Sequence, residues 1–115
     1  MLKSPQAKGK LFERWFAERL RHIGIDNHAR PEIGSGGGKH KGDIATRLPI
    51  TFELKNTKNF SAKAYLKQAE NAAMGYQEAV VLWKPAGEPM ENYKVFMSAS
   101  LFEKLLKAMF GKKFI

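Results

Sequence analysis

The segment from Ile50 to Thr57 constrains the fold more than any other part of this chain. From Ile50 to Lys55 its residues alternate strictly between apolar and polar, which is typical of a β-strand with two different faces. The apolar face carries Ile50, Phe52 and Leu54, and the polar face carries Thr51, Glu53, Lys55 and Thr57. Glu53 and Lys55 are therefore expected to point the same way from a strand whose other face belongs to a core.

The residues that follow predict a βαβ unit. A helix is expected at about 62–75, where Ser61 is suited to cap its start and Gly75 to end it. The apolar run at 79–83 is typical of a strand that is buried on both faces. Two strands joined through a helix in this way are expected to be parallel.

The remaining elements complete a single α/β domain over residues 1–115. The sequence predicts strands at about 25–33, 43–48 and 93–97, with the second joined to 50–57 at Leu48-Pro49. A last helix is expected where Ser100 and Glu103 have the spacing of a capping box. A first helix at about 7–23 carries one apolar stripe, made of Leu11, Phe12, Trp15, Phe16, Leu20 and Ile23. We expect an α/β sandwich with a mixed central sheet flanked by helices.

A glycine-rich segment interrupts this pattern at residues 34–42. Its glycine density is incompatible with regular structure, so we expect a flexible basic loop. It is not a Walker loop, because neither Lys39 nor Lys41 is followed by Ser or Thr. Two interpretations stay open: a plain hairpin loop, or a loop that closes on a nucleic-acid backbone.

The charge of the chain points to a polyanionic partner. Twenty Lys and Arg residues against eleven Asp and Glu residues give a net charge of +9, which favours nucleic acid or an anionic membrane surface. The chain has neither an apolar run of about 18 residues nor a signal-peptide pattern, so we expect a soluble, intracellular protein. With no cysteine and only three scattered histidines, zinc sites of the usual kinds are not expected.

Asp43 opens the strand expected next to 50–57. If the two strands form a hairpin, the Asp43 carboxylate comes within a few ångströms of Glu53, and Mg²⁺ requires oxygen ligands in such an arrangement. The ammonium group of Lys55 would lie beside the ion. The alternative is that the polar face of the strand is merely solvated.

These motifs resemble the PD-(D/E)XK nuclease superfamily, which has the restriction-endonuclease-like fold. Gly42-Asp43 and Glu53-Leu54-Lys55, after a helix that contains Glu13, carry the resemblance, although the frequent proline before the Asp is absent. More narrowly, the run Lys8-Gly9-Lys10-Leu11-Phe12-Glu13-Arg14, together with Gly34-Ser35-Gly36, looks like archaeal-type and phage Holliday junction resolvases. The resemblance covers roughly the first half of the chain. It implies an αβββαβ core, extended here by one more strand and a C-terminal helix.

The resemblance also implies roles for particular residues. Asp43, Glu53 and the backbone carbonyl of Leu54 would hold Mg²⁺, with Mn²⁺ as a substitute, and Lys55 would orient the attacking water and stabilise negative charge. Glu13 is expected to add a carboxylate, and we favour it over Glu18, which lies at the opposite border of the apolar stripe. The expected DNA-binding residues are Lys8, Lys10, Ser35, Lys39, Lys41, Lys58 and Gln68.

The function expected on this basis is that of a Mg²⁺-dependent, structure-selective DNA endonuclease in recombination and repair. A Holliday junction resolvase acts on two symmetric strands, so a homodimer is expected. The expected location is the cytoplasm of a prokaryotic or phage-infected cell. One alternative is another nuclease of the same superfamily, of a phage or restriction type. The other is a nucleic-acid-binding protein without catalysis, in which the carboxylates only balance charge.

Overall fold

A mixed three-stranded sheet forms the centre of the protein. The computed structural model describes residues 5–32, 42–73, 75 and 77–111. Strand β3 (Ile50–Thr57) is parallel to β4 (Glu78–Pro85), and β5 (Lys94–Met97) is antiparallel to β4, in the order β3-β4-β5. The short strands β1 (Arg30–Pro31) and β2 (Ile44–Ala45) form a separate antiparallel pair. The predicted α/β class and the predicted parallel βαβ unit are confirmed.

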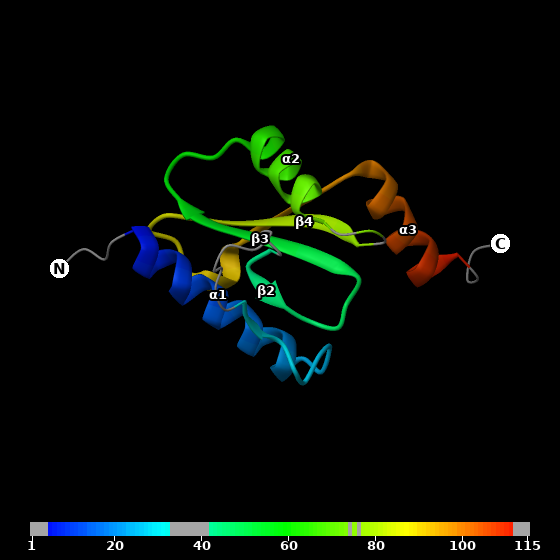
Figure 1. Ribbon diagram of the computed structural model, residues 1–115, viewed down its shortest axis with the longest axis horizontal. Helices are drawn as coiled ribbons and strands as arrows, with labels where there is room; N and C mark the ends of the chain where they lie inside the picture. Colours follow the sequence, from blue (N-terminus) through cyan, green and yellow to red (C-terminus); the bar gives the residue numbers. More distant parts are fainter. Residues whose placement is uncertain (1–4, 33–41, 74, 76, 112–115) are drawn as a thin grey trace.

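Two helices cover the two faces of the sheet, α1 (Pro5–His22) and α2 (Ala62–Ala72), as Figure 1 shows. The even-numbered residues of β3 and β4 face α1. Their core is made of Phe12, Phe16, Leu20, Phe52, Leu54, Val80 and Leu82. A smaller cluster on the α2 side is built from Ala69, Ala79 and Val81. The alternation of residues 50–57 therefore divides the two sides of the sheet as the sequence predicts.

The second predicted strand is much shorter than expected. Residues 47–49 form bends, and residue 46 does not continue the strand that was expected over 43–48. The reason is that side-chain oxygens bind backbone N–H groups here: Thr46 Oγ1 accepts from Leu48 N at 3.1 Å, and the buried Asp26 accepts from Arg47 N at 2.6 Å. The hairpin is accordingly reduced to a local contact between Asp43 and β3, and β2 pairs with β1 instead.

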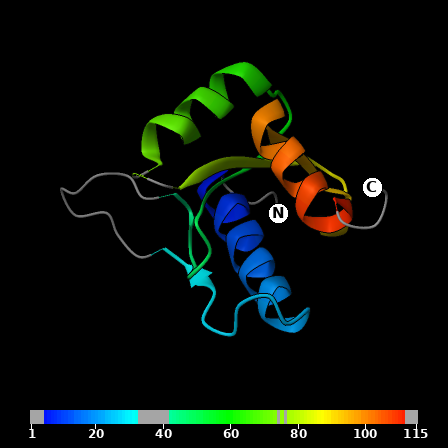
Figure 2. The same ribbon diagram turned by 90° about the vertical axis from the view of Figure 1, so that its right-hand side faces the viewer.

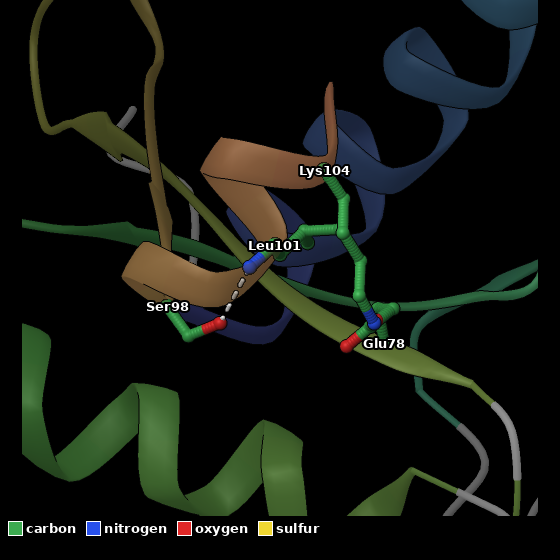
Figure 3. A network of polar contacts seen from close by, with 4 residues as sticks. All are labelled: Glu78, Ser98, Leu101 and Lys104. Carbon is green, nitrogen blue, oxygen red and sulfur yellow. Dashed lines mark hydrogen bonds and ion pairs between the residues drawn. The ribbon is translucent and has the colours of Figure 1, made fainter. Parts of the chain in front are cut away.

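The helix boundaries also differ from the prediction at two caps. Helix α2 does begin after Ser61, whose hydroxyl accepts from Ala64 N, but it ends at Ala72, before Gly75. The last helix, α3 (Ala99–Phe110), begins one residue after Ser98, whose Oγ accepts from Leu101 N at 3.1 Å (Figure 3). The capping box predicted at Ser100 is therefore wrong, since Ser100 already lies inside the helix. No helix in the described part of the chain has both the length and the apolarity needed to cross a membrane.

The position of this cap can be tested by two alanine substitutions. Ser98→Ala removes the side-chain acceptor of the first turn of α3 and should lower the free energy of unfolding by about 1 kcal/mol. Ser100→Ala places a good helix former at an exposed position inside the helix and should leave stability equal or slightly higher. Urea denaturation of both variants measures the difference, and a larger loss for Ser100→Ala would contradict the observed cap.

Candidate active site

The Asp43 carboxylate lies against the outer edge of β3, between the positions of Glu53 and Lys55. The backbone N–H of Asp43 donates to the carbonyl of Phe52 at 2.7 Å, and Oδ2 of Asp43 accepts from Leu54 N at 2.7 Å. In an extended strand the N–H and C=O of one residue point to the same side. The Leu54 carbonyl therefore faces the same edge as the Asp43 carboxylate, and two hard oxygen donors are brought together there.

Gly42 makes this close approach possible. It has a φ of +84°, and a Cβ atom at this position would lie 2.9 Å from the Phe52 carbonyl oxygen and 2.9 Å from Cγ2 of Thr51. A side chain is excluded both by the backbone conformation and by the backbone of β3. The Gly42-Asp43 motif thus has a local structural cause: the glycine lets the chain touch β3, and the aspartate next to it reaches Leu54.

The polar face of β3 is buried, not solvated. Thr51 and Glu53 are each 1% exposed, on the side of the sheet that α2 covers. Thr51 Oγ1 donates to Oε1 of Gln77 at 2.7 Å. A carboxylate withdrawn from water to this degree is costly unless polar or cationic groups compensate it. The interpretation of Glu53 as an ordinary surface acid is therefore wrong.

Lys55 is held by an aromatic ring that the sequence analysis did not single out. Its Nζ lies 4.8 Å from the centroid of the Tyr65 ring on α2, within the range of a cation–π interaction. Lys55 is half-buried, so this contact restricts where the ammonium can go. No motif marks Tyr65; only its place on the helix that returns over β3 brings it to Lys55.

The end of β3 that carries Lys55 is anchored by the chain that follows it. The carbonyl of Thr57 accepts from Nε1 of Trp83 at 3.0 Å, and the Trp83 ring stacks on Phe60 with centroids 4.6 Å apart. These contacts tie β3, β4 and the loop before α2 together two residues beyond Lys55. The site therefore rests on a rigid part of the sheet.

Two lysines belong to a polar contact at the same end of the sheet. The Asn56 amide donates to the Lys8 carbonyl at 3.2 Å, and Nζ of Lys84 donates to Oδ1 of Asn56 at 3.5 Å. The start of α1 and the ends of β3 and β4 thus meet on the side of the sheet that α1 covers. Lys84 is 8% exposed, and its polar contact within the described residues is with a neutral amide. Lys84 belongs to no motif, and a single lysine after an apolar strand is a weak signal.

The other predicted site residues are less closely associated. Glu13 is half-buried on α1, whereas Glu18 is exposed and lines a surface hollow with Trp15, Arg19 and His22. Lys10, Lys58 and Gln68 are exposed. Among the described residues, no three His, Asp or Glu side chains form a group that could hold a metal ion by themselves. Ser35, Lys39 and Lys41 lie outside the described residues.

Comparison with known proteins does not assign the chain to a family. No family model matches it, and no curated protein or solved structure matches it either. Its chemistry therefore has to be argued from the arrangement of its own residues.

The role of Gly42 can be tested against a second glycine. Gly42→Ala forces a left-handed conformation on alanine and a contact of 2.9 Å with backbone, so the free energy of unfolding should fall by about 2–3 kcal/mol. Gly9→Ala is the matched control, because Gly9 lies inside α1 with nothing within 4 Å of the added methyl group, and it should raise stability by about 0.5–1 kcal/mol. Chemical denaturation checks both values; equal effects would contradict the close approach of Gly42 to β3.

Proposed function

We propose that this protein is a Mg²⁺-dependent DNA endonuclease of the PD-(D/E)XK superfamily, with the restriction-endonuclease-like fold. The observation that carries the proposal is the hydrogen bond from Leu54 N to Asp43 Oδ2, at the centre of the Glu53-Leu54-Lys55 motif. Two sequence motifs separated by ten residues thereby meet at one point of the structure. The order of elements is compatible with the αβββαβ core of that fold, since α1 is followed by three strands, then by α2 and then by β4.

The oxygen donors at the edge of β3 fit a hard divalent cation. Mg²⁺ is usually bound through one or two carboxylates and keeps several of its waters, so a cage of three acidic side chains is not required. Asp43, the Leu54 carbonyl and Glu53 would hold the ion, and the half-buried Glu13 is the candidate for a further carboxylate. When bound, the cation would neutralise charge on the phosphate and make its bound water a better nucleophile.

Lys55 would act on the scissile phosphate itself. A cation beside the metal site stabilises the negative charge that develops on the phosphoryl oxygens during attack, and such electrostatic stabilisation works best when the group is held in place. The Tyr65 ring holds Lys55, and this contact orients the ammonium. We therefore assign Lys55 as a charge stabiliser and Tyr65 as its positioning residue.

The lysines at the same end of the sheet would bind the sugar-phosphate backbone next to the site. Lys8 and Lys84 are linked through Asn56 on the α1 side of the sheet, opposite the face that carries Lys55, so a nucleic-acid strand would meet them only where it passes around the end of β3. Phosphate contacts of this kind provide affinity and register without sequence preference. This basic group also supports the second candidate, a nucleic-acid-binding protein without catalysis.

Within the superfamily, the resemblance of the first half of the chain favours branched DNA, and a four-way junction above all. Resolution of a junction needs two symmetric nicks, which a two-fold homodimer supplies with two copies of one site. A nuclease that nicks only one strand of a linear duplex would need no such pairing. The substrate and the dimer are thus connected parts of one proposal.

The catalytic assignment can be tested by two substitutions. Asp43→Asn and Lys55→Ala should each lower Mg²⁺-dependent nicking of a four-way junction at least 100-fold, because one removes a metal ligand and the other a stabilising charge. Binding of the same junction in Ca²⁺ should change little. The measurement is single-turnover cleavage on a gel, with a linear duplex of equal length cut more slowly.

Matched controls come from exposed positions away from β3. Glu88→Gln removes one negative charge from the turn after β4, as Asp43→Asn does at the site, and Lys94→Ala removes one positive charge from β5, as Lys55→Ala does. Both control variants should cleave like the original protein. A protein that binds junctions but never nicks them in Mg²⁺ or Mn²⁺ would support the non-catalytic alternative. Faster cleavage of the linear duplex would remove the resolvase assignment while leaving the nuclease assignment in place.

The positioning role of Tyr65 has its own test. Tyr65→Leu removes the ring beneath Lys55 and should lower the cleavage rate about twofold to thirtyfold, the equivalent of a cation–π interaction worth about 0.5–2 kcal/mol. Tyr65→Phe keeps the ring and should cleave nearly as fast as the original protein. If Tyr65→Leu lowers the rate equally in a Lys55→Ala background, the effect does not act through Lys55.

A further inference from the structure

Three aromatic rings surround Phe60 on the α2 side of the sheet. The Phe60 ring stacks on Trp83 of β4, with centroids 4.6 Å apart and an angle of 11° between the ring planes. Its centroid lies 5.1 Å from that of Tyr65 on α2 and 4.8 Å from that of Phe96 on β5. Aromatic rings at such separations attract each other beyond the burial of their area. We call Phe60 and these three residues the Phe60 cluster.

The Phe60 cluster lies directly beside Lys55. Trp83 is the register partner of Lys55 on the neighbouring strand, so both side chains leave the same face of the sheet from backbones about 4.8 Å apart. Tyr65 is the residue whose ring lies 4.8 Å from Lys55 Nζ. Figures 1 and 2 show α2 on one face of the sheet and α1 on the other, with the loop after β3 rising from the end of the sheet to α2. A nucleotide whose phosphate is bound at Lys55 would therefore have these rings within reach of its base.

The rings of the Phe60 cluster are incompletely buried. On the α1 side of the sheet, Phe12, Phe16 and Phe52 are 0%, 5% and 6% exposed, as expected of rings that serve the core alone. All four rings of the Phe60 cluster, in contrast, remain half-buried. The cluster thus packs against the sheet and also keeps aromatic surface that a ligand can contact.

The segment that supplies Phe60 and Tyr65 is strongly basic. Between Glu53 and Glu70 the chain has four lysines and no acidic residue. Lys55 is one of them, and the other three are exposed and form no ion pair within the described residues. These three are Lys58, Lys63 and Lys67. Lysines interleaved with aromatic rings are typical of surfaces that bind single-stranded nucleic acid, because the lysines contact phosphates and the rings stack on bases.

We propose that the Phe60 cluster stacks on an unpaired nucleobase of the DNA strand whose phosphate is bound at Lys55. This inference rests on the proposed function for the position of that phosphate. The bases of a duplex have both faces covered by their neighbours, so a base must leave the stack before a side-chain ring can contact it. Unpairing costs least for a base that is mismatched or already single-stranded. The site therefore selects DNA with unpaired nucleotides next to the bond that is cleaved.

The first test compares two oligonucleotides with the same number of phosphates. One is a short run of thymines, and the other has abasic sites in place of its central thymines. In Ca²⁺, fluorescence anisotropy should show that the original protein binds the thymine oligonucleotide at least about fivefold tighter, which is the lower limit for one stacked base. Equal affinities would overturn the proposal, because they would mean that only the phosphates are bound.

Substitution of Phe60 tests whether this preference comes from the cluster. Phe60→Leu removes the ring but keeps an apolar side chain, and it should bring the two affinities to within about twofold of each other. Phe60→Tyr keeps the ring and should keep the preference. Phe102→Leu is the matched control, because it makes the same exchange at an exposed position of α3 and should bind both oligonucleotides like the original protein. If Phe60→Leu weakens binding of both oligonucleotides equally, Phe60 has only a packing role and the proposal is overturned.

A fluorescent base reports on the stacking itself. When 2-aminopurine is placed between two abasic sites it has no neighbouring base to stack on, so contact with the rings should lower its fluorescence. At saturating concentrations, the original protein and Phe60→Tyr should lower this fluorescence at least about twofold, whereas Phe60→Leu should leave it nearly unchanged. Unchanged fluorescence with the saturated original protein would contradict contact between the base and the cluster.

These measurements separate the inference from the proposed function, because none of them requires cleavage. If the protein nicks DNA but binds both oligonucleotides equally, the base-stacking site is refuted and the nuclease assignment stays. If the protein prefers the thymine oligonucleotide through Phe60 but never nicks DNA, the base-stacking site stays and the nuclease assignment is refuted.

Discussion

The contact between Gly42-Asp43 and the edge of β3 is the constraint on which the candidate site depends. Two hydrogen bonds of 2.7 Å, one from the Asp43 backbone and one to its carboxylate, join segments that do not belong to the same sheet. Only a glycine can stand before Asp43 at this separation. The carboxylate consequently lies at a strand edge, beside a carbonyl that has no partner strand in the three-stranded sheet. An edge of this kind can bind a ligand, whereas the interior of a sheet cannot.

The polar residues of β3 are buried or half-buried, although their hydropathy predicts a face exposed to solvent. Helix α2 covers the face that carries Thr51, Glu53 and Lys55, and the chain keeps polar residues there despite the cost. Hydrogen bonding accounts for Thr51 through Gln77, and the Tyr65 ring accounts for the orientation of Lys55. Polar groups retained in such a position are typical of functional sites, where local stability is sacrificed for a fixed arrangement of charge.

Most of the fold could be predicted because each strong local pattern agrees with its tertiary surroundings. The alternation at 50–57, the apolar run of β4 and the stripe of α1 each bury the face that their periodicity indicates. The predicted element boundaries are wrong where side-chain oxygens bind backbone N–H groups. Asp26 and Thr46 bind N–H groups that a longer β2 would need, and Ser98 caps α3 two residues before the serine that the capping-box spacing selects. The Asp26 contact joins residues 21 positions apart, which a local pattern cannot reveal. The Thr46 and Ser98 contacts are local, but a pattern of residue types does not decide which of several nearby hydroxyl groups binds the backbone.

By itself the sequence determined the α/β class and the parallel βαβ unit, because both follow from the periodicity of apolar residues. Its composition determined the high positive charge. The spacing of Asp43, Glu53 and Lys55 was enough to mark them as one candidate group. Tertiary structure alone decided that Asp43 binds Leu54 N, that Glu53 is buried, that Tyr65 holds Lys55 and that Lys84 joins Lys8 through Asn56. It also decided that Phe102, Leu105, Leu106 and Met109 of α3 are exposed in the part of the chain that the structure describes. These features arise between residues far apart in the chain, where the available space and the approach of another element, rather than residue type, decide which groups meet.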